Sequence, residues 1–282
     1  MAKRGGGKPR QPLSQRRPGK AAARGTPKGP SATSRPRTKA SAARKTATAA
    51  RPSPSQSRRL AHPGRVPARG DDAARRRHAE AVWNHLAALY PDAHCELDFR
   101  SPWELLVATI LSAQCTDKRV NMVTPVLFER WPSPAALAAA EASALEGVIK
   151  STGFFRAKTR ALLGVAAAVT DVHGGAVPSR MEDLVVLPGV GRKTANVVLG
   201  NAFGVNEGVV VDTHVGRLAV RLGLTSETDP VKVEAALMAL FDRERWTLLS
   251  HLLIWHGRRV CEARKPRCGD CRLNAICPAS LA

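Results

Sequence analysis

The basic residues of this chain are distributed very unevenly, and this limits how much of it can form a folded domain. The first 70 of its 282 residues hold 19 Lys and Arg and no Asp or Glu, whereas the other 212 hold 25 basic and 23 acidic side chains. The first segment is rich in Pro, Gly, Ser, Ala and Thr and has no aromatic residue. It cannot bury enough apolar surface to offset the entropy lost on ordering. We therefore expect residues 1–72 to form a disordered basic tail and residues 73–282 to fold.

The net charge of +19 on this segment suits a polyanion, because phosphates neutralised by Lys and Arg release their counterions. We favour a tail that binds DNA. An organelle transit peptide, which is also Arg- and Ser-rich and poor in acidic residues, is one alternative. An extension created by the choice of start codon is another. The abundance of Ala, Arg, Gly and Pro is typical of a GC-rich genome, so we expect a nucleoid-associated protein of a bacterial cytoplasm.

Nothing in the sequence indicates a membrane protein or a secreted one. No apolar run reaches the roughly 18 residues that span a bilayer, and no signal-peptide core is present. Six cysteines in a chain of this size do not form the pattern of a secreted disulfide scaffold. Four of them lie within residues 261–277, which indicates a metal site and a reducing compartment.

Helix signals recur through residues 73–282, whereas strand signals are almost absent. Ser101–Glu104 (SPWE) is typical of a capped helix start with proline in the first turn. Ser133–Pro134 predicts the start of an Ala-rich helix, and Asp229–Pro230 predicts another. The β-branched run Val209–Val211 is too short to found a sheet. We expect an all-α fold of many short helices.

A Gly-rich turn separates two helical patterns near the middle of the folded part. Met181–Leu187 is apolar at helical spacing, Pro188 ends that pattern, and a second pattern covers Lys193–Ala202. This is a helix-hairpin-helix, whose N–H groups hold one phosphate without reading bases, although a plain helix–helix turn is the alternative. The amine of Lys193 would lie in the positive field at the start of the second helix, which disfavours its charged form. The residues expected to hold the phosphate are Gly189, Gly191, Arg192 and Thr194.

Four motifs resemble those of endonuclease III, a family of bifunctional DNA glycosylases and abasic-site lyases. In chain order they are Leu111–Asp117 (LSAQCTD), Leu187–Asn196 (LPGVGRKTAN), Val211–His214 (VDTH) and the array Cys261-x6-Cys268-x2-Cys271-x5-Cys277. The resemblance runs from about residue 79 to residue 278. It implies an enzyme of base excision repair that removes oxidised or damaged pyrimidines from duplex DNA. A Lys Schiff base would then lead to strand cleavage by β-elimination.

The resemblance also implies the catalytic residues. Lys193 matches the lysine that attacks C1′ of the extruded nucleotide and displaces the damaged base. Asp212 matches the aspartate that stabilises the positive charge developing on the sugar and assists proton transfer. An N-cap for a helix over Thr213–Leu222 is the alternative role for Asp212, and the two roles are compatible.

Two further residues match those that fill the hole left by an extruded base. Gln114 matches the glutamine of the family, and Phe154 lies where the family places its apolar wedge. The family pattern there is Leu then Tyr, whereas this chain has Phe154–Phe155, so either ring could insert. We expect Phe155 to pack in the core.

The cysteine array matches the [4Fe–4S] motif of the family, with Cys261, Cys268, Cys271 and Cys277 as ligands. A zinc ribbon is the alternative, but its ligands usually pair with two to four residues between them, and the first gap here is six residues. The basic residues expected to bind phosphate from the first loop are Arg264, Lys265 and Arg267.

The remaining cysteines, Cys95 and Cys115, are expected to be small buried hydrophobes. We expect His214 and His256 to be structural.

We expect two helical lobes with DNA in the cleft between them, in a protein that acts as a monomer. One is a six-helix lobe over residues 95–206 that carries the hairpin, and the other is discontinuous, 73–94 plus 207–282, and carries the cluster. Two other functions remain open. A monofunctional adenine-mispair glycosylase shares the hairpin, the aspartate and the cluster but has Ser or another residue in place of Lys193. A non-catalytic DNA clamp would need neither Lys193 nor a wedge.

Overall fold

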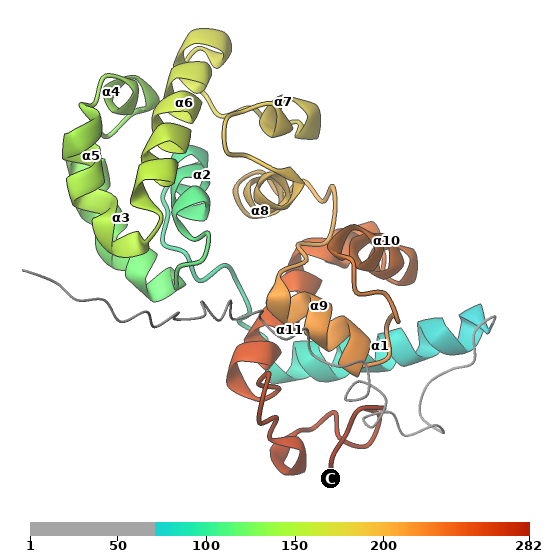
Figure 1. Ribbon diagram of the computed structural model, residues 1–282. Coiled ribbons are helices and arrows are strands. Elements are labelled where there is room, and N and C mark those ends of the chain that lie inside the picture. Colours follow the sequence, from blue (N-terminus) through green and yellow to red (C-terminus); the bar gives the residue numbers. More distant parts are fainter. Residues whose placement is uncertain (1–70) are drawn as a thin grey trace, which may run out of the picture. The chain divides into compact units, whose positions relative to one another are not determined.

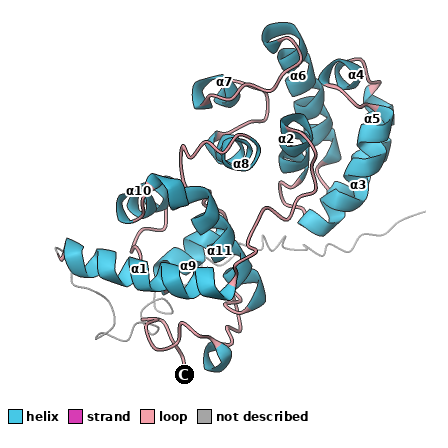
Figure 2. Cartoon of the chain, turned by 180° about the vertical axis from the view of Figure 1, so that it is seen from behind, coloured by secondary structure: helices cyan, strands magenta, loops and turns pink. Residues whose placement is uncertain are grey.

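The computed structural model describes residues 71–282, and residues 1–70 lie outside the described part. Figure 2 shows that the described residues form helices joined by loops, without a strand. The prediction of an all-α fold is therefore confirmed for this part of the chain. None of its helices is long and apolar enough to cross a membrane.

The first helix begins within the segment that we assigned to the tail. Helix α1 spans Asp72–Leu89, and its N-cap is Asp71, whose side chain accepts a hydrogen bond of 2.8 Å from the N–H of Ala74. A carboxylate at this position satisfies one of the N–H groups that have no partner within the helix. Asp71 and Asp72, which we assigned to the tail, therefore belong to the folded part.

Residues 97–199 supply the buried side chains of a first hydrophobic cluster. The helices here are α2 (Pro102–Leu111), α3 (Asp117–Arg130), α4 (Pro134–Ala138), α5 (Ala142–Ile149), α6 (Phe155–His173), α7 (Met181–Val185) and α8 (Arg192–Ala202), with the 3₁₀ turn η2 (Lys150–Thr152). Helix α2 packs against α3, α6 and α8 (Figure 1), and Leu105–Ala108 in it are fully buried. Most of these helices are too short to be stable alone, so packing holds them.

The Ala-rich stretch forms two helices, where we expected one. Ser133 caps α4 as predicted, but the chain leaves the helix after Ala138, and Glu141 begins α5 by accepting from the N–H of Ala144 at 2.8 Å. The side chain of Glu141 serves the backbone at a new helix start, so the residue is not inside a continuous helix. The described part of the chain between residues 95 and 206 consequently has seven α-helices instead of six.

A second hydrophobic cluster combines α1 with the C-terminal third of the chain. Its other helices are α9 (Thr213–Arg221), α10 (Pro230–Leu240) and α11 (Trp246–Arg259), followed by the 3₁₀ turn η4 (Cys268–Asp270); the short turn η3 (Arg243–Arg245) precedes α11. Helix α1 contributes Ala79, Val82 and Leu86, and it lies beside α11 although the two are far apart in the sequence (Figure 1). The two clusters support our interpretation of two lobes, whose exact boundaries stay a prediction.

Candidate active site

Lys193 and Asp212 line the same open cavity, which has a volume of about 120 Å³. Lys193 is the second residue of α8 and is exposed, and Asp212 is the N-cap of α9. Leu97 and Ser112 of the first cluster region and His251 of α11 also line the cavity. A primary amine and a carboxylate thus come together from helices that belong to different hydrophobic clusters.

The hairpin before Lys193 has a backbone that suits an anion. Gly189 has φ +77°, and a Cβ there would lie 2.7 Å from the Cβ of Ala161, so only glycine fits. Gly191 is the N-cap of α8 and supplies no side chain to bond the first N–H groups of this helix. Uncapped N–H groups at a helix start can bind a phosphate.

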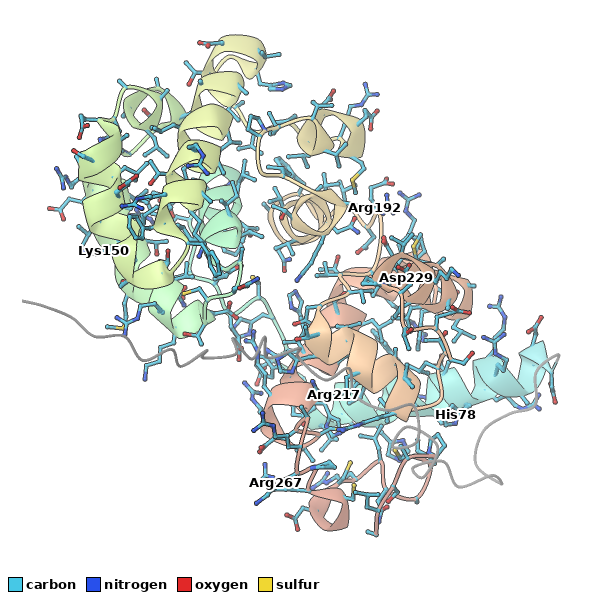
Figure 3. The ribbon with its side chains drawn as sticks, viewed as in Figure 1. His78, Lys150, Arg192, Arg217, Asp229 and Arg267 are labelled. Atoms are coloured by element: carbon cyan, nitrogen blue, oxygen red, sulfur yellow. The ribbon has the colours of Figure 1, made fainter. Side chains whose placement is uncertain are left out.

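The side chain of Arg192 in the hairpin already has bonding partners within the protein. Its Nε donates to both carboxylate oxygens of Glu234 at 3.0 and 3.1 Å, and its Nη2 donates to the carbonyl of Glu207 at 3.1 Å. The amide of Asn196 donates to the same carboxylate at 3.0 Å, and Glu234 is only 8% exposed. Figure 3 shows Arg192 at the start of α8 on the side of α10. The hydrogen bond to Glu234 also raises the pKa of Arg192.

The sequence analysis did not identify Glu234 and Asn196. Glu234 lies 42 positions from Arg192 and 38 from Asn196, and no short motif links them. The guanidinium of Arg192 therefore holds the start of α8 against α10, and what remains available for a phosphate is its backbone N–H.

Asp212 is the N-cap of α9, as the alternative reading of this residue predicted. Its Oδ1 accepts hydrogen bonds of 2.8 Å from the N–H groups of His214 and Val215. Its Oδ2 has no hydrogen bond within residues 71–282. One oxygen of the Asp212 carboxylate thus caps the helix, and the other is free of hydrogen bonds in the described residues.

Gln114 and Phe154 share an unusual backbone conformation. They are the only non-glycine residues between positions 71 and 282 with positive φ, at 51° and 48°. Phe154 is 66% exposed, whereas Phe155 is partly buried against the first hydrophobic cluster. A bulky residue with positive φ is strained, and such strain collects at functional sites. This arrangement suits the wedge that we predicted at Phe154, and that role stays a prediction.

The four C-terminal cysteines line one cavity, together with Arg221 and His256. The guanidinium of Arg221 donates to the Sγ of Cys261 at 3.4 Å, and Nε2 of His256 lies 3.5 Å from the Sγ of Cys271. The hydroxyl of Tyr90 bonds the other ring nitrogen of His256 at 2.9 Å. No three His, Cys, Asp or Glu side chains in the described residues are close enough to hold a single metal ion.

Helix α9 also fixes the loop that contains the first cysteine. The Nη2 of Arg217 donates to the carbonyl of Cys261 at 3.0 Å, and Arg221 donates to the carbonyls of residues 262 and 263, each at 2.8 Å. Arg264 and Lys265 follow and are exposed, while the guanidinium of Arg267 donates to the carbonyl of Arg259. Figure 3 shows Arg217 on α9 and Arg267 in the C-terminal loops. The loop backbone is held, and two cations remain open to solvent.

The other cysteines and histidines that we singled out have structural surroundings. Cys95 and Cys115 are partly buried against the first cluster, and burial raises the pKa of the Cys95 thiol to about 11. Burial lowers the pKa of His214, whose Nδ1 lies 3.2 Å from the guanidinium of Arg217. His251 was not anticipated: its Nε2 bonds the side-chain oxygen of Asn201 at 2.7 Å, and burial lowers its pKa to about 4.

Comparison with known proteins assigns the chain to a family. Residues 107–243 match the model of the HhH-GPD superfamily of base excision DNA repair proteins. The chain is also 52% identical over 210 residues to endonuclease III of Synechocystis sp., which covers 74% of this chain and 96% of that protein. The chain belongs to the endonuclease III family. The resemblance drawn from the four motifs is thereby confirmed.

Solved structures of endonuclease III have the same fold. One is a non-covalent endonuclease III–DNA complex, and another is a trapped endonuclease III–DNA covalent intermediate, an estranged-adenine complex. Each is 42% identical to this chain, with a TM-score of 0.70, and each match covers 73% of this chain and 96% of the solved one. Members of this family therefore bind DNA, and at least one has been captured covalently joined to it.

Proposed function

We propose that this chain is a DNA glycosylase of base excision repair that also cleaves the resulting abasic strand. Its substrate is duplex DNA that carries an oxidised or otherwise damaged pyrimidine. The observation that carries this proposal is the pairing of Lys193 with Asp212 in one cavity of an endonuclease III chain. The covalent DNA intermediate of a relative supports the same chemistry.

Lys193 supplies the nucleophile. Its neutral amine attacks C1′ of the extruded nucleotide, the C1′–N bond to the base breaks, and the base leaves with a proton. Opening of the sugar gives a Schiff base between Nζ and C1′. Loss of a proton from C2′ then expels the 3′ phosphate, which is β-elimination. Hydrolysis of the Schiff base frees the lysine.

Asp212 acts on the same sugar from the start of α9. Its charge stabilises the positive charge that develops at C1′ as the base departs. The oxygen that is free of the helix cap is the one available for proton transfer to and from Lys193. Capping fixes the carboxylate in place, so catalysis and capping reinforce each other.

DNA is held by backbone and side-chain contacts from both clusters. The start of α8, with Gly189, Gly191, Arg192 and Thr194, binds one phosphate through N–H groups. Gln114 and Phe154 enter the duplex and replace the stacking and pairing of the extruded nucleotide, a loss of a few kcal/mol. Arg264, Lys265 and Arg267 bind the backbone from the cysteine loop.

Cys261, Cys268, Cys271 and Cys277 would hold a [4Fe–4S] cluster. The four side chains line one cavity, four thiolates are the usual ligand set of such a cluster, and the six-residue first gap does not suit zinc. When bound, the cluster would tie these cysteines together and could exchange one electron. The side chains of Arg221 and His256 place polar groups beside the sulfurs of Cys261 and Cys271.

The setting in the cell follows from sequence alone. We place the protein as a monomer on the nucleoid of a bacterial cytoplasm, which composition and the charge of residues 1–70 support.

Borohydride trapping on duplex DNA with one thymine glycol tests the function. The wild-type protein should form a covalent adduct, because reduction fixes the Schiff base, and Lys193→Ala should form none. Lys232→Ala, which removes an exposed lysine of α10, serves as the matched control and should trap normally. Base release without an adduct would identify the monofunctional adenine-type mechanism. Neither release nor adduct, with the cluster intact, would leave a DNA clamp as the better reading.

A further inference from the structure

Lys158 is a buried cation of α6 without an acidic partner. It is 5% exposed, and it takes part in no ion pair within residues 71–282. Burial lowers its pKa from the ordinary value for lysine. A lysine that remains in the interior without a carboxylate usually has a specific set of hydrogen bonds to make.

The partners of Lys158 are two backbone carbonyls at the ends of two helices. Its Nζ donates to the carbonyl of Leu111 at 2.8 Å and to that of Thr152 at 2.8 Å. Leu111 is the last residue of α2, and Thr152 is the last residue of η2. No other donor to either oxygen is found in the described part of the chain. One ammonium thus caps both helix ends, where a positive charge is favourable.

Each capped helix end leads directly into a strained loop. Gln114, at φ 51°, lies three residues after Leu111, and Phe154, at φ 48°, lies two residues after Thr152. The backbone N–H of Lys158 also donates to the carbonyl of Phe154 at 3.1 Å. Lys158 therefore bonds the chain just before Phe154, at Phe154 itself, and at the base of the Gln114 loop (residues 112–116). We call residues 153–154 the Phe154 tip.

We propose that Lys158 is a positioning residue that holds the Gln114 loop and the Phe154 tip in fixed register, so that both can enter the duplex together during base extrusion. The inference rests on the proposed function. Strained segments keep their conformation only when the surrounding structure determines it, and the two bonds of Nζ join these two segments directly. Without this ammonium, the carbonyls of Leu111 and Thr152 lose their hydrogen-bond donor. The Gln114 loop and the Phe154 tip are then no longer held by the same side chain.

Lys158→Met tests this inference in the full-length holoprotein, because it keeps the length of the side chain and removes its donors. Base release is measured under single-turnover conditions on two DNAs with the same lesion. One lesion is fully paired, and the other lies in a mismatched bubble, where it is already unstacked. Release from paired DNA should fall by roughly tenfold to a hundredfold. Release from the bubble should stay within about threefold, because little extrusion work remains there.

A second comparison links Lys158 to the loop. If Lys158 acts through the Gln114 loop, Lys158→Met should cost much less in a Gln114→Ala background, and the double variant should be non-additive. Lys232→Met, at an exposed lysine of α10, is the matched control and should release base at the wild-type rate from both DNAs. Should Lys158→Met not fold, Lys158→Gln replaces it, since its amide can still donate to one carbonyl and should give a smaller but still selective loss.

The outcomes separate a positioning role from a merely structural one. Equal losses on paired and bubble DNA, or additivity with Gln114→Ala, would overturn the proposal, as would an unchanged rate on paired DNA. Absence of base release from the wild type and the Lys232→Met control would overturn the proposed function instead.

Discussion

At the scale of single residues, the two oxygens of the Asp212 carboxylate differ in their hydrogen bonds. Oδ1 accepts from two N–H groups at the start of α9, while Oδ2 has no hydrogen bond in residues 71–282. Asparagine caps helices as well as aspartate does but carries no charge. Substitution can therefore separate the stability that comes from the cap from the electrostatic role that we propose for this residue.

Asp212→Asn should keep the fold and lose most of the activity. Unfolding free energy should change by less than about 0.5 kcal/mol, because the cap remains, whereas Asp212→Ala should lose about 0.5–2 kcal/mol. Single-turnover base release by Asp212→Asn should fall by about 10²–10⁴-fold. Urea unfolding and release kinetics measure the two effects. Full activity in a stable Asp212→Asn protein would mean that the residue serves the helix alone.

His251 should make the stability of the protein depend on pH. Burial lowers its pKa to about 4 from 6.5, with His94 and Arg258 acting in the same direction and Glu96 opposing them. As pH falls, the unfolded chain binds the proton first. The stability is therefore complete above pH 6.5 and is lost as pH falls towards 4, by about 2 kcal/mol between pH 7 and pH 5.

The comparison for this prediction is His251→Gln, which cannot titrate in this range but can still donate to Asn201. Urea unfolding at pH 7 and pH 5 should show wild-type protein losing about 2 kcal/mol more than the variant. Parallel losses in the two proteins would assign the acid sensitivity to other groups.

At the scale of elements, the segments around Gln114 and Phe154 have a backbone conformation that lowers stability. Phe154 exposes a large apolar ring in a left-handed conformation, which costs about 1–2 kcal/mol for a residue other than glycine. Nothing in the packing of α6 requires that ring, because Phe155 is the one that packs against the first cluster. The strain is therefore consistent with selection for contact with DNA.

Phe154→Gly should be at least as stable as the wild type although it removes a large side chain. Relief of about 1–2 kcal/mol of strain exceeds the 0.5–1 kcal/mol that glycine loses through its greater freedom when unfolded. Base release from paired DNA should nevertheless slow, because the wedge is gone. Phe155→Ala should show the opposite pattern, with about 2 kcal/mol or more lost in unfolding free energy. Thermal unfolding and single-turnover kinetics on both variants decide which ring is the wedge.

Elements that depend on neighbouring residues in the sequence could be predicted, whereas those that depend on contacts between residues far apart in the sequence could not. The hairpin was predictable because its proline and glycines determine the turn within a few residues. The break after Ala138 was not, because Ala continues a helix readily and Glu141, which caps the next helix, is not one of the usual N-cap residues. The role of Lys158 was also hidden, since its side chain bonds backbone carbonyls, one of them 47 positions away, and carbonyls leave no signature in a sequence.

At the scale of the whole folded part, ion pairs join helices of the two hydrophobic clusters. Arg192 of α8 pairs with Glu234 of α10 at 2.9 Å, and Arg258 of α11 pairs with Asp117 of α3 at 2.7 Å. Helix α9 then connects Asp212 to the cysteine loop through its arginines. Asp212 and the cysteine loop are therefore linked through one helix, while Arg192 bonds the hairpin to α10.

Residues 1–70 carry a net charge of +19, whereas residues 71–282 carry only +2. This uneven charge predicts that the two parts of the chain have different functions. The folded part should carry the chemistry and the basic segment most of the nonspecific affinity for DNA. Deleting residues 1–70 should reduce the slope of log K against log salt by ~0.9 for each lost phosphate contact. Single-turnover base release at saturating DNA should stay unchanged, because Lys193, Asp212 and the hairpin remain. Titrations on undamaged duplex at several salt concentrations measure the slope. An unchanged slope would exclude a DNA tether and favour a targeting peptide.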